Sequence, residues 1–194
     1  MLKFCHVFTL ALCLILLCGA RSYGSDKPEI RIPDDRELIY AKFLDKWLGP
    51  PGVKSINLAN IADIPDSREI ETYRDCIKNS KLEELTETRT AFSFSGTSIE
   101  HRRNIHLINR DLWEPSDPWD AIGDGKPVEQ ALRKGFADGL LTLSQIMFDE
   151  QHKIAVFSYS FSCGSLCGNG SAVMFLKTKA GWRQSKRSCG FWIS

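Results

Sequence analysis

Phe-Ser-Cys-Gly-Ser-Leu-Cys-Gly-Asn-Gly-Ser, from Phe161 to Ser171, is the stretch that decides the fold. It places two cysteines, Cys163 and Cys167, among three glycines, with an apolar run on each side. Glycine adopts the positive φ of a sharp reversal without steric cost, and Asn-Gly is a common turn pair. The stretch therefore predicts the tight connection of a C-terminal β-hairpin, closed by a disulfide.

The residues around this turn have the pattern of short strands. Lys153–Ser162 alternates, and one face carries Ala155, Phe157, Tyr159 and Phe161. Leu141–Phe148 precedes it, and Ala172–Lys177 and Trp182–Ile193 follow, each after a short turn. Short strands joined by short turns predict a four-stranded antiparallel meander. We expect one face of this sheet to meet water and the other to carry the N-terminal helices.

The N-terminal half has helical patterns. After Asp34 and Asp35, apolar side chains recur at helical spacing: Ile39, Tyr40, Phe43, Leu44, Trp47 and Leu48. We interpret these aromatic side chains as a buried helix face rather than a ligand platform. Asp66 and Glu69 form a capping-box pattern that opens a second helix, and Pro127 suits the first turn of a third. The predicted fold class is α+β, with N-terminal helices packed on the C-terminal meander.

Residues 1–20 have the pattern of a secretory signal peptide. Lys3 precedes an apolar stretch, Phe4–Leu17, and the small residues Gly19 and Ala20 end the segment. The stretch is shorter than the roughly 20 residues of a membrane-spanning helix. The alternative is a lipid anchor at Cys18. We predict that residues 21–194 form a single globular domain without a transmembrane segment, exported to the periplasm or secreted.

The charges of the chain nearly balance. It has 25 Lys and Arg against 24 Asp and Glu, and the predicted signal peptide removes only Lys3 from this count. Affinity for nucleic acid comes largely from an excess of basic side chains that meet phosphates. A neutral domain therefore argues against a nucleic-acid partner.

Four cysteines remain after the predicted signal peptide: Cys76, Cys163, Cys167 and Cys189. In an oxidising compartment four cysteines indicate two disulfides, with three connectivities. We favour Cys163–Cys167 with Cys76–Cys189, and the main rival joins Cys163 to Cys189. Structural disulfides are favoured over a zinc site or a catalytic thiol, and no metal or cofactor is predicted.

Residues 113–125 form an acidic, tryptophan-containing segment. Its candidate ligand-binding side chains are Trp113, Glu114, Asp117, Trp119, Asp120 and Asp124. Carboxylates ligate calcium, tryptophan stacks on sugars, and two carboxyl groups across a cleft hydrolyse glycosides. The spacing does not match an EF-hand, and nothing in it selects a catalytic pair. We favour a structural loop held by its own tryptophans, and its two prolines and two glycines predict no regular structure.

The C-terminal part resembles a group of uncharacterised secreted bacterial proteins. The resemblance rests on Cys163-Gly-Ser-Leu-Cys-Gly-Asn-Gly170, on Leu143-Ser144, Phe148, Ala155 and Trp182, and on the terminal Trp192-Ile193-Ser194. It covers roughly the last fifty residues, and the Cys-Gly-x-Leu-Cys-Gly-x-Gly core is its specific part. The resemblance implies a bacterial exported protein and brings no activity or assigned site.

These patterns favour a non-catalytic exported domain that binds a protein, a peptide or an envelope glycan, or serves as an accessory protein of the envelope. The default pocket is a concave sheet lined by Phe157, Tyr159 and the neighbouring helices. The alternative is a hydrolase that uses carboxylates of the loop 113–125.

Overall fold

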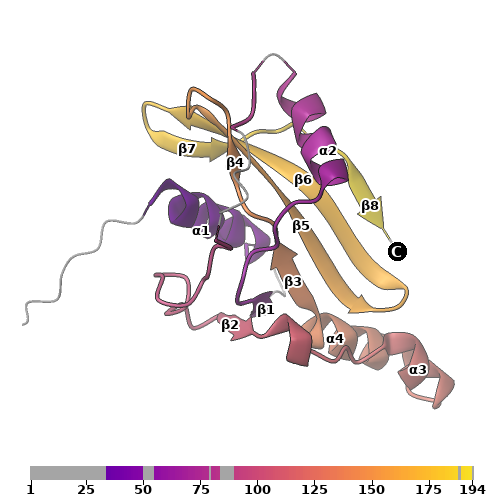
Figure 1. Cartoon of the computed structure of the whole chain (residues 1–194). Helices are drawn as coiled ribbons and strands as arrows, with labels where there is room; N and C mark the ends of the chain where they lie inside the picture. The colour runs from indigo at the N-terminus through magenta and orange to yellow at the C-terminus, as the bar shows by residue number, and fades with distance from the viewer. Residues whose placement is uncertain (1–33, 50–54, 79, 84–89, 188, 194) are drawn as a thin grey trace, which may run out of the picture. The chain divides into compact units, whose positions relative to one another are not determined.

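The computed structural model describes residues 34–49, 55–78, 80–83, 90–187 and 189–193. The predicted signal peptide and Cys18 lie outside the described residues. In chain order the elements are α1 (Asp35–Trp47), β1 (Ile56–Ala59), α2 (Ser67–Ile77), β2 (Ile105–Ile108), η1 (Arg110–Leu112), α3 (Pro118–Gly123), α4 (Val128–Asp138), β3 (Leu140–Leu143), β4 (Met147–Phe148), β5 (Ile154–Gly164), β6 (Cys167–Thr178), β7 (Gly181–Gln184) and β8 (Phe191–Ile193) (Figure 1).

The predicted helices begin at their predicted caps. Asp34 accepts a hydrogen bond from the Glu37 N–H at 2.8 Å at the start of α1. At the start of α2, the side chain and N–H of Asp66 bond reciprocally with those of Glu69, which confirms the capping box. These bonds satisfy N–H groups that have no partner inside the helix. Local sequence therefore sets both starts.

The strands form one mixed sheet. Its hydrogen-bonded path is β2-β1-β3-β5-β6-β7, with β4 on β5 and β8 on β6. β1 is parallel to β2 and to β3, whereas the other pairs are antiparallel. The prediction of a C-terminal four-stranded antiparallel meander is thus not confirmed. The short patterns at Ile56–Ala59 and Ile105–Ile108 indicate strands, but a strand pattern alone does not identify its partner.

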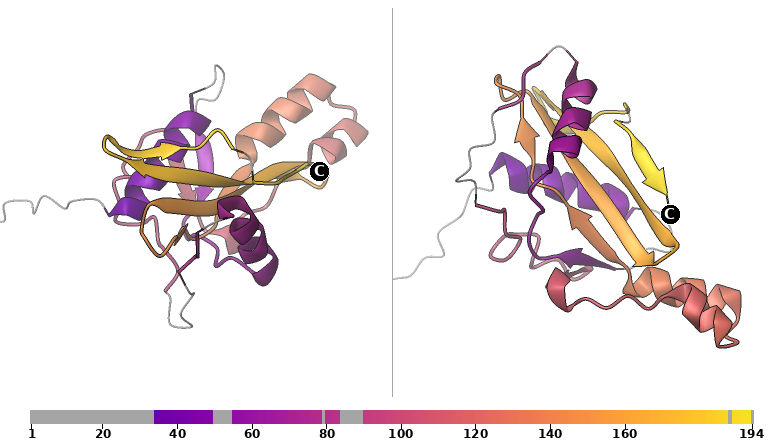
Figure 2. Two further views of the ribbon diagram at one scale, coloured as in Figure 1. Left: turned by 90° about the horizontal axis from the view of Figure 1, so that it is seen from above. Right: turned by 45° about the vertical axis from the view of Figure 1, so that its right-hand side comes forward.

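Helices cover both faces of the sheet, so the prediction of one wet face is wrong. Tyr40 and Phe43 of α1 contact Phe157 edge-on, with ring centroids 5.3 Å apart in each pair. On the other face, Tyr73 and Cys76 of α2 pack in a second cluster that includes Val156. Figure 2 shows α1 and α2 on opposite sides of the long strands. Neighbouring residues of β5 point to opposite faces, and both Val156 and Phe157 are fully buried.

A bulge between β3 and β4 connects the two layers. Both strands pair with β5, and the step from Leu143 to Met147 spans one residue more than the facing step of β5. The Tyr40 hydroxyl donates to the Ser144 carbonyl at 2.7 Å, and the Tyr73 hydroxyl lies 2.7 Å from Ser144 Oγ. Burial raises the pKa of both tyrosines, that of Tyr73 to about 12, so both hydroxyls keep their protons. One serine therefore anchors helices from both faces.

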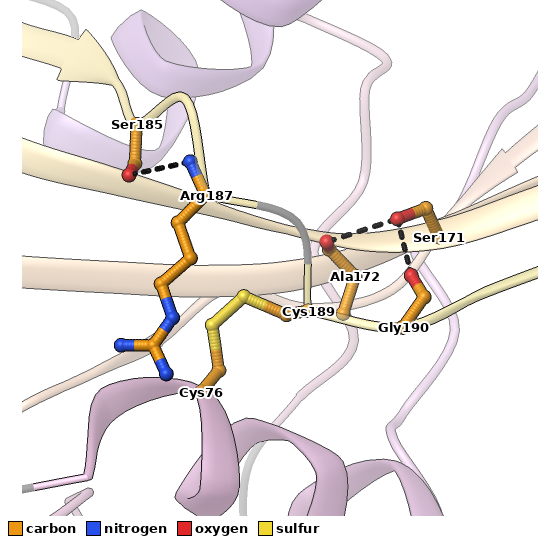
Figure 3. The surroundings of a disulfide bond; sticks show 7 residues. All are labelled: Cys76, Ser171, Ala172, Ser185, Arg187, Cys189 and Gly190. Atoms are coloured by element: carbon orange, nitrogen blue, oxygen red, sulfur yellow. Dashed lines mark hydrogen bonds between the residues drawn. A yellow bond between two sulfur atoms is a disulfide. The ribbon is translucent and has the colours of Figure 1, made fainter.

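Both favoured disulfides are confirmed. Cys163–Cys167 closes the hairpin turn between β5 and β6, with Cα atoms 5.1 Å apart. Cys76–Cys189 joins α2 to the segment before β8, across 113 residues of sequence (Figure 3). In the chain-entropy picture a small loop contributes ~2 kcal/mol of stability and a loop of over a hundred residues ~5 kcal/mol. The disulfide framework thus stabilises both the turn and the packing of α2.

Candidate ligand-binding groove

An open groove lies on the face of the sheet that α1 covers. It runs between α1, α4, β5, β6 and residues 184–187, and its volume is about 980 Å³. Small-molecule sites in proteins commonly have volumes of ~300–1,000 Å³ and mostly apolar walls. The groove is therefore large enough for a ligand with an extended apolar body.

The inner surface of the groove is aromatic. Its rings belong to Phe43, Trp47, Phe136, Tyr159 and Phe161. Trp47 contacts Tyr159 edge-on at 5.0 Å between centroids, and Phe136 stacks on Phe161 at 6.0 Å with an interplanar angle of 5°. Phe43 and Phe161 are buried, whereas Phe136 is 56% exposed. The rings thus form a continuous floor with one accessible wall on α4.

Cations surround this floor. Lys46, Arg133 and Lys186 border the groove, and no described residue that lines it is an aspartate or glutamate. Lys46 and Lys186 have no ion-pair partner among the described residues. Arg133 pairs with Glu129 at 3.0 Å, where both side chains are strongly exposed and the pair is weak. The rim is therefore positive, although the whole chain is nearly neutral.

Arg187 also borders the groove, but its guanidinium points away from it. Figure 3 shows this side chain extending toward α2, beside Cys76. We therefore assign the positive rim to Lys46, Arg133 and Lys186 alone.

Three polar groups of the groove have no hydrogen-bond partner among the described residues. They are Gln184 Oε1, which is buried, the Tyr159 hydroxyl and the Asn169 side-chain amide. Burial raises the pKa of Tyr159, so its hydroxyl remains a donor at neutral pH. A buried polar atom without a partner costs stability unless water or a ligand bonds to it. These groups offer directional bonds to a molecule in the groove.

Close packing at α4 gives the groove its outer wall. Gly135 lies against Pro118 and the Cys163 carbonyl, where an added Cβ would collide with the proline ring. Only glycine permits this approach of the helix to the hairpin. This close contact at Gly135 places the part of α4 that carries Arg133 and Phe136 beside the floor of the groove.

The acidic segment mainly supports this packing. Asp117 accepts from the Trp119 N–H at 2.9 Å and from the Ser165 N–H at 2.7 Å, and the bonds from Ser165 and then Trp119 hold its pKa below the ordinary value. Trp113 Nε1 donates to the Asp138 carbonyl at 3.0 Å. The prediction of no regular structure is wrong, because residues 118–123 form α3 with Pro118 in its first turn. A missing N–H costs nothing at that position.

The other predicted ligand-binding residues of this segment remain at the surface. Glu114, Asp120 and Asp124 are exposed, and Trp119 is 48% exposed. None of the six candidate side chains lines the groove or the smaller hollow on the opposite face. Neither of these two cavities therefore brings the carboxylates together as a pair.

The sequence predicted part of the groove. Tyr159 lines it as expected, whereas Phe157 is fully buried beneath α1. Trp47 belongs both to the packed helix face and to the groove, so the two interpretations of that face are not exclusive. The rim residues Arg133 and Lys186 are ordinary surface cations in the sequence. Only the tertiary structure brings them together.

The described residues lack both a metal-binding cluster and a helix that could cross a membrane. No three of their His, Cys, Asp or Glu side chains gather into a group able to hold a metal ion. None of their helices combines the length and apolarity that crossing a membrane requires. Comparisons with protein-family models, curated proteins and solved structures found no match.

Proposed function

We propose that this protein is an exported, non-catalytic binding domain whose groove holds a carboxylate with an aliphatic chain. The observation that carries the proposal is the pairing of a continuous aromatic floor with a positive rim, where no described lining residue is an acid. An aliphatic chain would cover the floor, and the carboxylate would meet Lys46 and Lys186. The sequence alone predicts an unspecified protein, peptide or glycan ligand. For the groove on the α1 face, we replace that prediction with an aliphatic carboxylate.

The energetics favour such a ligand over a purely polar anion. Burying apolar surface contributes ~25 cal/mol per Å² before the costs of association. A cation beside a partly desolvated carboxylate forms a stronger hydrogen bond than a neutral donor does. The Tyr159 hydroxyl is an additional donor in the groove. Affinity would therefore come from the chain, and preference for an anion from the rim.

The apolar surface continues beyond the groove. Phe191 and Ile193 of β8 pair with Ser171 and Asn169 of β6, which line the groove, and both are 75% exposed. Paired residues of neighbouring strands share one face of a sheet. An aliphatic ligand longer than the groove would find further apolar contacts there.

Three observations support the exported part of the proposal. The N-terminal pattern is that of a signal peptide, and the C-terminal motif resembles secreted bacterial proteins. In the structure all four of Cys76, Cys163, Cys167 and Cys189 are in disulfides. Disulfides persist in oxidising compartments and are rare in the cytosol. A carrier or sensor of aliphatic carboxylates outside the cytoplasm fits these features.

Calorimetric titration with three probes that share a ten-carbon chain tests the proposal: decanoate, 1-decanol and decyltrimethylammonium. We expect decanoate to bind ~10-fold more tightly than the cationic probe, a difference of about 1.4 kcal/mol. Changing both Lys46→Gln and Lys186→Gln should weaken decanoate binding ~10-fold and leave 1-decanol within about 2-fold.

The matched control removes two exposed lysines outside the groove, Lys42→Gln and Lys179→Gln. It has the same net charge as the test variant and should bind decanoate like the unmodified protein. Equal affinity for the anionic and cationic probes, or equal losses in both double variants, would contradict the proposal.

A further inference from the structure

A second hollow lies on the face of the sheet opposite the groove. α2, the β3–β5 region and the segment that includes β8 surround it, and its volume is about 340 Å³. α2 covers the sheet at Val156 and Met174, and the hollow begins where the strands continue past the helix. It is a site of different chemistry from the aromatic groove.

Hydroxyl groups form the floor of this hollow. They belong to Thr72, Thr142, Ser144, Ser158 and Ser160. Tyr73 hydrogen-bonds to Ser144 Oγ and Ser158 Oγ at 2.7 and 2.8 Å and fixes their positions. The Ser160 hydroxyl has no partner among the described residues. A hydroxyl both donates and accepts, so this floor complements a ligand that is itself rich in hydroxyl groups.

Trp192 forms an aromatic wall of the hollow. It pairs with Gly170, and its indole lies against that glycine, where an added Cβ would collide with the ring. The side chain is 44% exposed, and its Nε1–H has no partner among the described residues. A half-exposed indole held against the sheet offers an apolar surface and one hydrogen-bond donor.

The charged groups at the edge of the hollow balance one another. Asp63 accepts two hydrogen bonds from Arg110, at 2.7 and 2.8 Å. Glu69 accepts one from the Asp66 N–H at 3.2 Å, and the neighbouring Arg68 has no ion-pair partner among the described residues. The edge thus contains both signs, which favours a neutral polar ligand over an ion.

We propose that this hollow binds a neutral saccharide, one or two sugar units of a glycan. The sugar's C–H face would pack on Trp192, and its hydroxyls would bond to Ser160 and to the edge groups Arg68 and Glu69. Saccharides present such an apolar face beside many hydroxyls, and a mostly apolar wall with a few polar groups is typical of small-ligand sites. This inference does not depend on a ligand in the aromatic groove.

NMR titration with maltose, cellobiose and diacetylchitobiose tests the proposal. We expect at least one of them to shift the Trp192 indole and Ser160 amide resonances, with a Kd in the range of ~0.1–10 mM. Trp192→Ala should weaken that binding ~10-fold or more, and Ser160→Ala about 2–5-fold. Decanoate binding by Trp192→Ala should match that of the unmodified protein, which separates this site from the groove.

The matched control is Ile193→Ala. Ile193 follows Trp192 in β8, points to the opposite face, is more exposed and does not line the hollow, so its loss should leave saccharide binding within about 2-fold. Unchanged Trp192 and Ser160 resonances with all three sugars at about 20 mM would overturn the proposal. So would saccharide binding that survives Trp192→Ala or is lost equally in Ile193→Ala.

Discussion

The two faces of the sheet differ in chemistry although the same strands make both. On the α1 face, β5 presents Phe157, Tyr159 and Phe161; on the α2 face it presents Val156 and then Ser158 and Ser160. Because side chains alternate along a strand, one sequence can build an aromatic groove and a hydroxyl-lined hollow back to back. The helices then decide which part of each face is core and which part stays open.

Removing a disulfide should have the largest effect on stability. Cys76–Cys189 joins α2, on one face of the sheet, to the segment that follows residues 184–187 at the edge of the groove. Replacing both cysteines by serine should lower the free energy of unfolding by ~3–5 kcal/mol, against ~2 kcal/mol for the Cys163–Cys167 pair. Urea denaturation under non-reducing conditions measures both values.

The same two variants also test ligand binding in the groove. Lys186 lies three residues before Cys189, so loss of the Cys76–Cys189 disulfide should weaken decanoate binding. Loss of the Cys163–Cys167 disulfide is the control for this effect on binding. A larger loss of stability from the short-range disulfide would show that α2 is held mainly by its packing.

Tyrosine substitutions test how firmly each helix is tied to the bulge at Ser144. Tyr73→Phe removes bonds to Ser144 Oγ and Ser158 Oγ, whereas Tyr40→Phe removes one bond, to the Ser144 carbonyl. We expect Tyr73→Phe to cost ~1–2 kcal/mol and Tyr40→Phe about 1 kcal/mol. Chemical denaturation checks these values, and a cost below about 0.3 kcal/mol for both would contradict the role of the bulge as a shared anchor.

The smallest expected effect is the pH dependence that Asp35 of α1 contributes. Lys177 donates to Asp35 at 2.8 Å and holds the pKa of that carboxyl below its ordinary value. The folded state therefore binds this proton less readily than the unfolded state, so the contribution is present above pH ~4 and is lost as the pH falls further. Solvent screening limits it to about 0.5 kcal/mol.

In Asp35→Asn, the unfolding temperature should accordingly fall less steeply between about pH 4 and pH 2 than in the unmodified protein. Thermal unfolding at a series of pH values measures this slope. Asp66→Asn is the control, because Asp66 caps α2 and forms no salt bridge to a lysine or arginine among the described residues. An unchanged acid slope in Asp35→Asn would contradict the link between Asp35 and Lys177.

Sequence patterns predicted the features that local physics determines. Helical spacing and capping residues located α1 and α2, and the strand alternation assigned Phe157 and Val156 to opposite faces. Cysteine positions favoured the observed pairing because a turn rich in glycine brings Cys163 to Cys167. These features need no knowledge of distant partners.

The features that the sequence did not predict depend on tertiary contacts. β1 and β2 are four residues each, and their parallel pairing follows from a crossover that their patterns do not encode. The sequence pattern does not predict α3, because prolines usually break helices, whereas Pro118 occupies a tolerated position in the first turn. Phe136 and Lys186 are far apart in the sequence, and only the packing of α4 and the course of residues 184–187 place them around one groove.

One titration tests the central claim most directly, namely that the α1 face binds an aliphatic carboxylate. Trp47 lines the groove and Trp192 lines the hollow, so their indole N–H resonances report on the two faces within one spectrum. The account predicts that decanoate shifts the Trp47 resonance and leaves that of Trp192 in place. A shift of Trp192 without one of Trp47, or no shift of either at saturating decanoate, would contradict it.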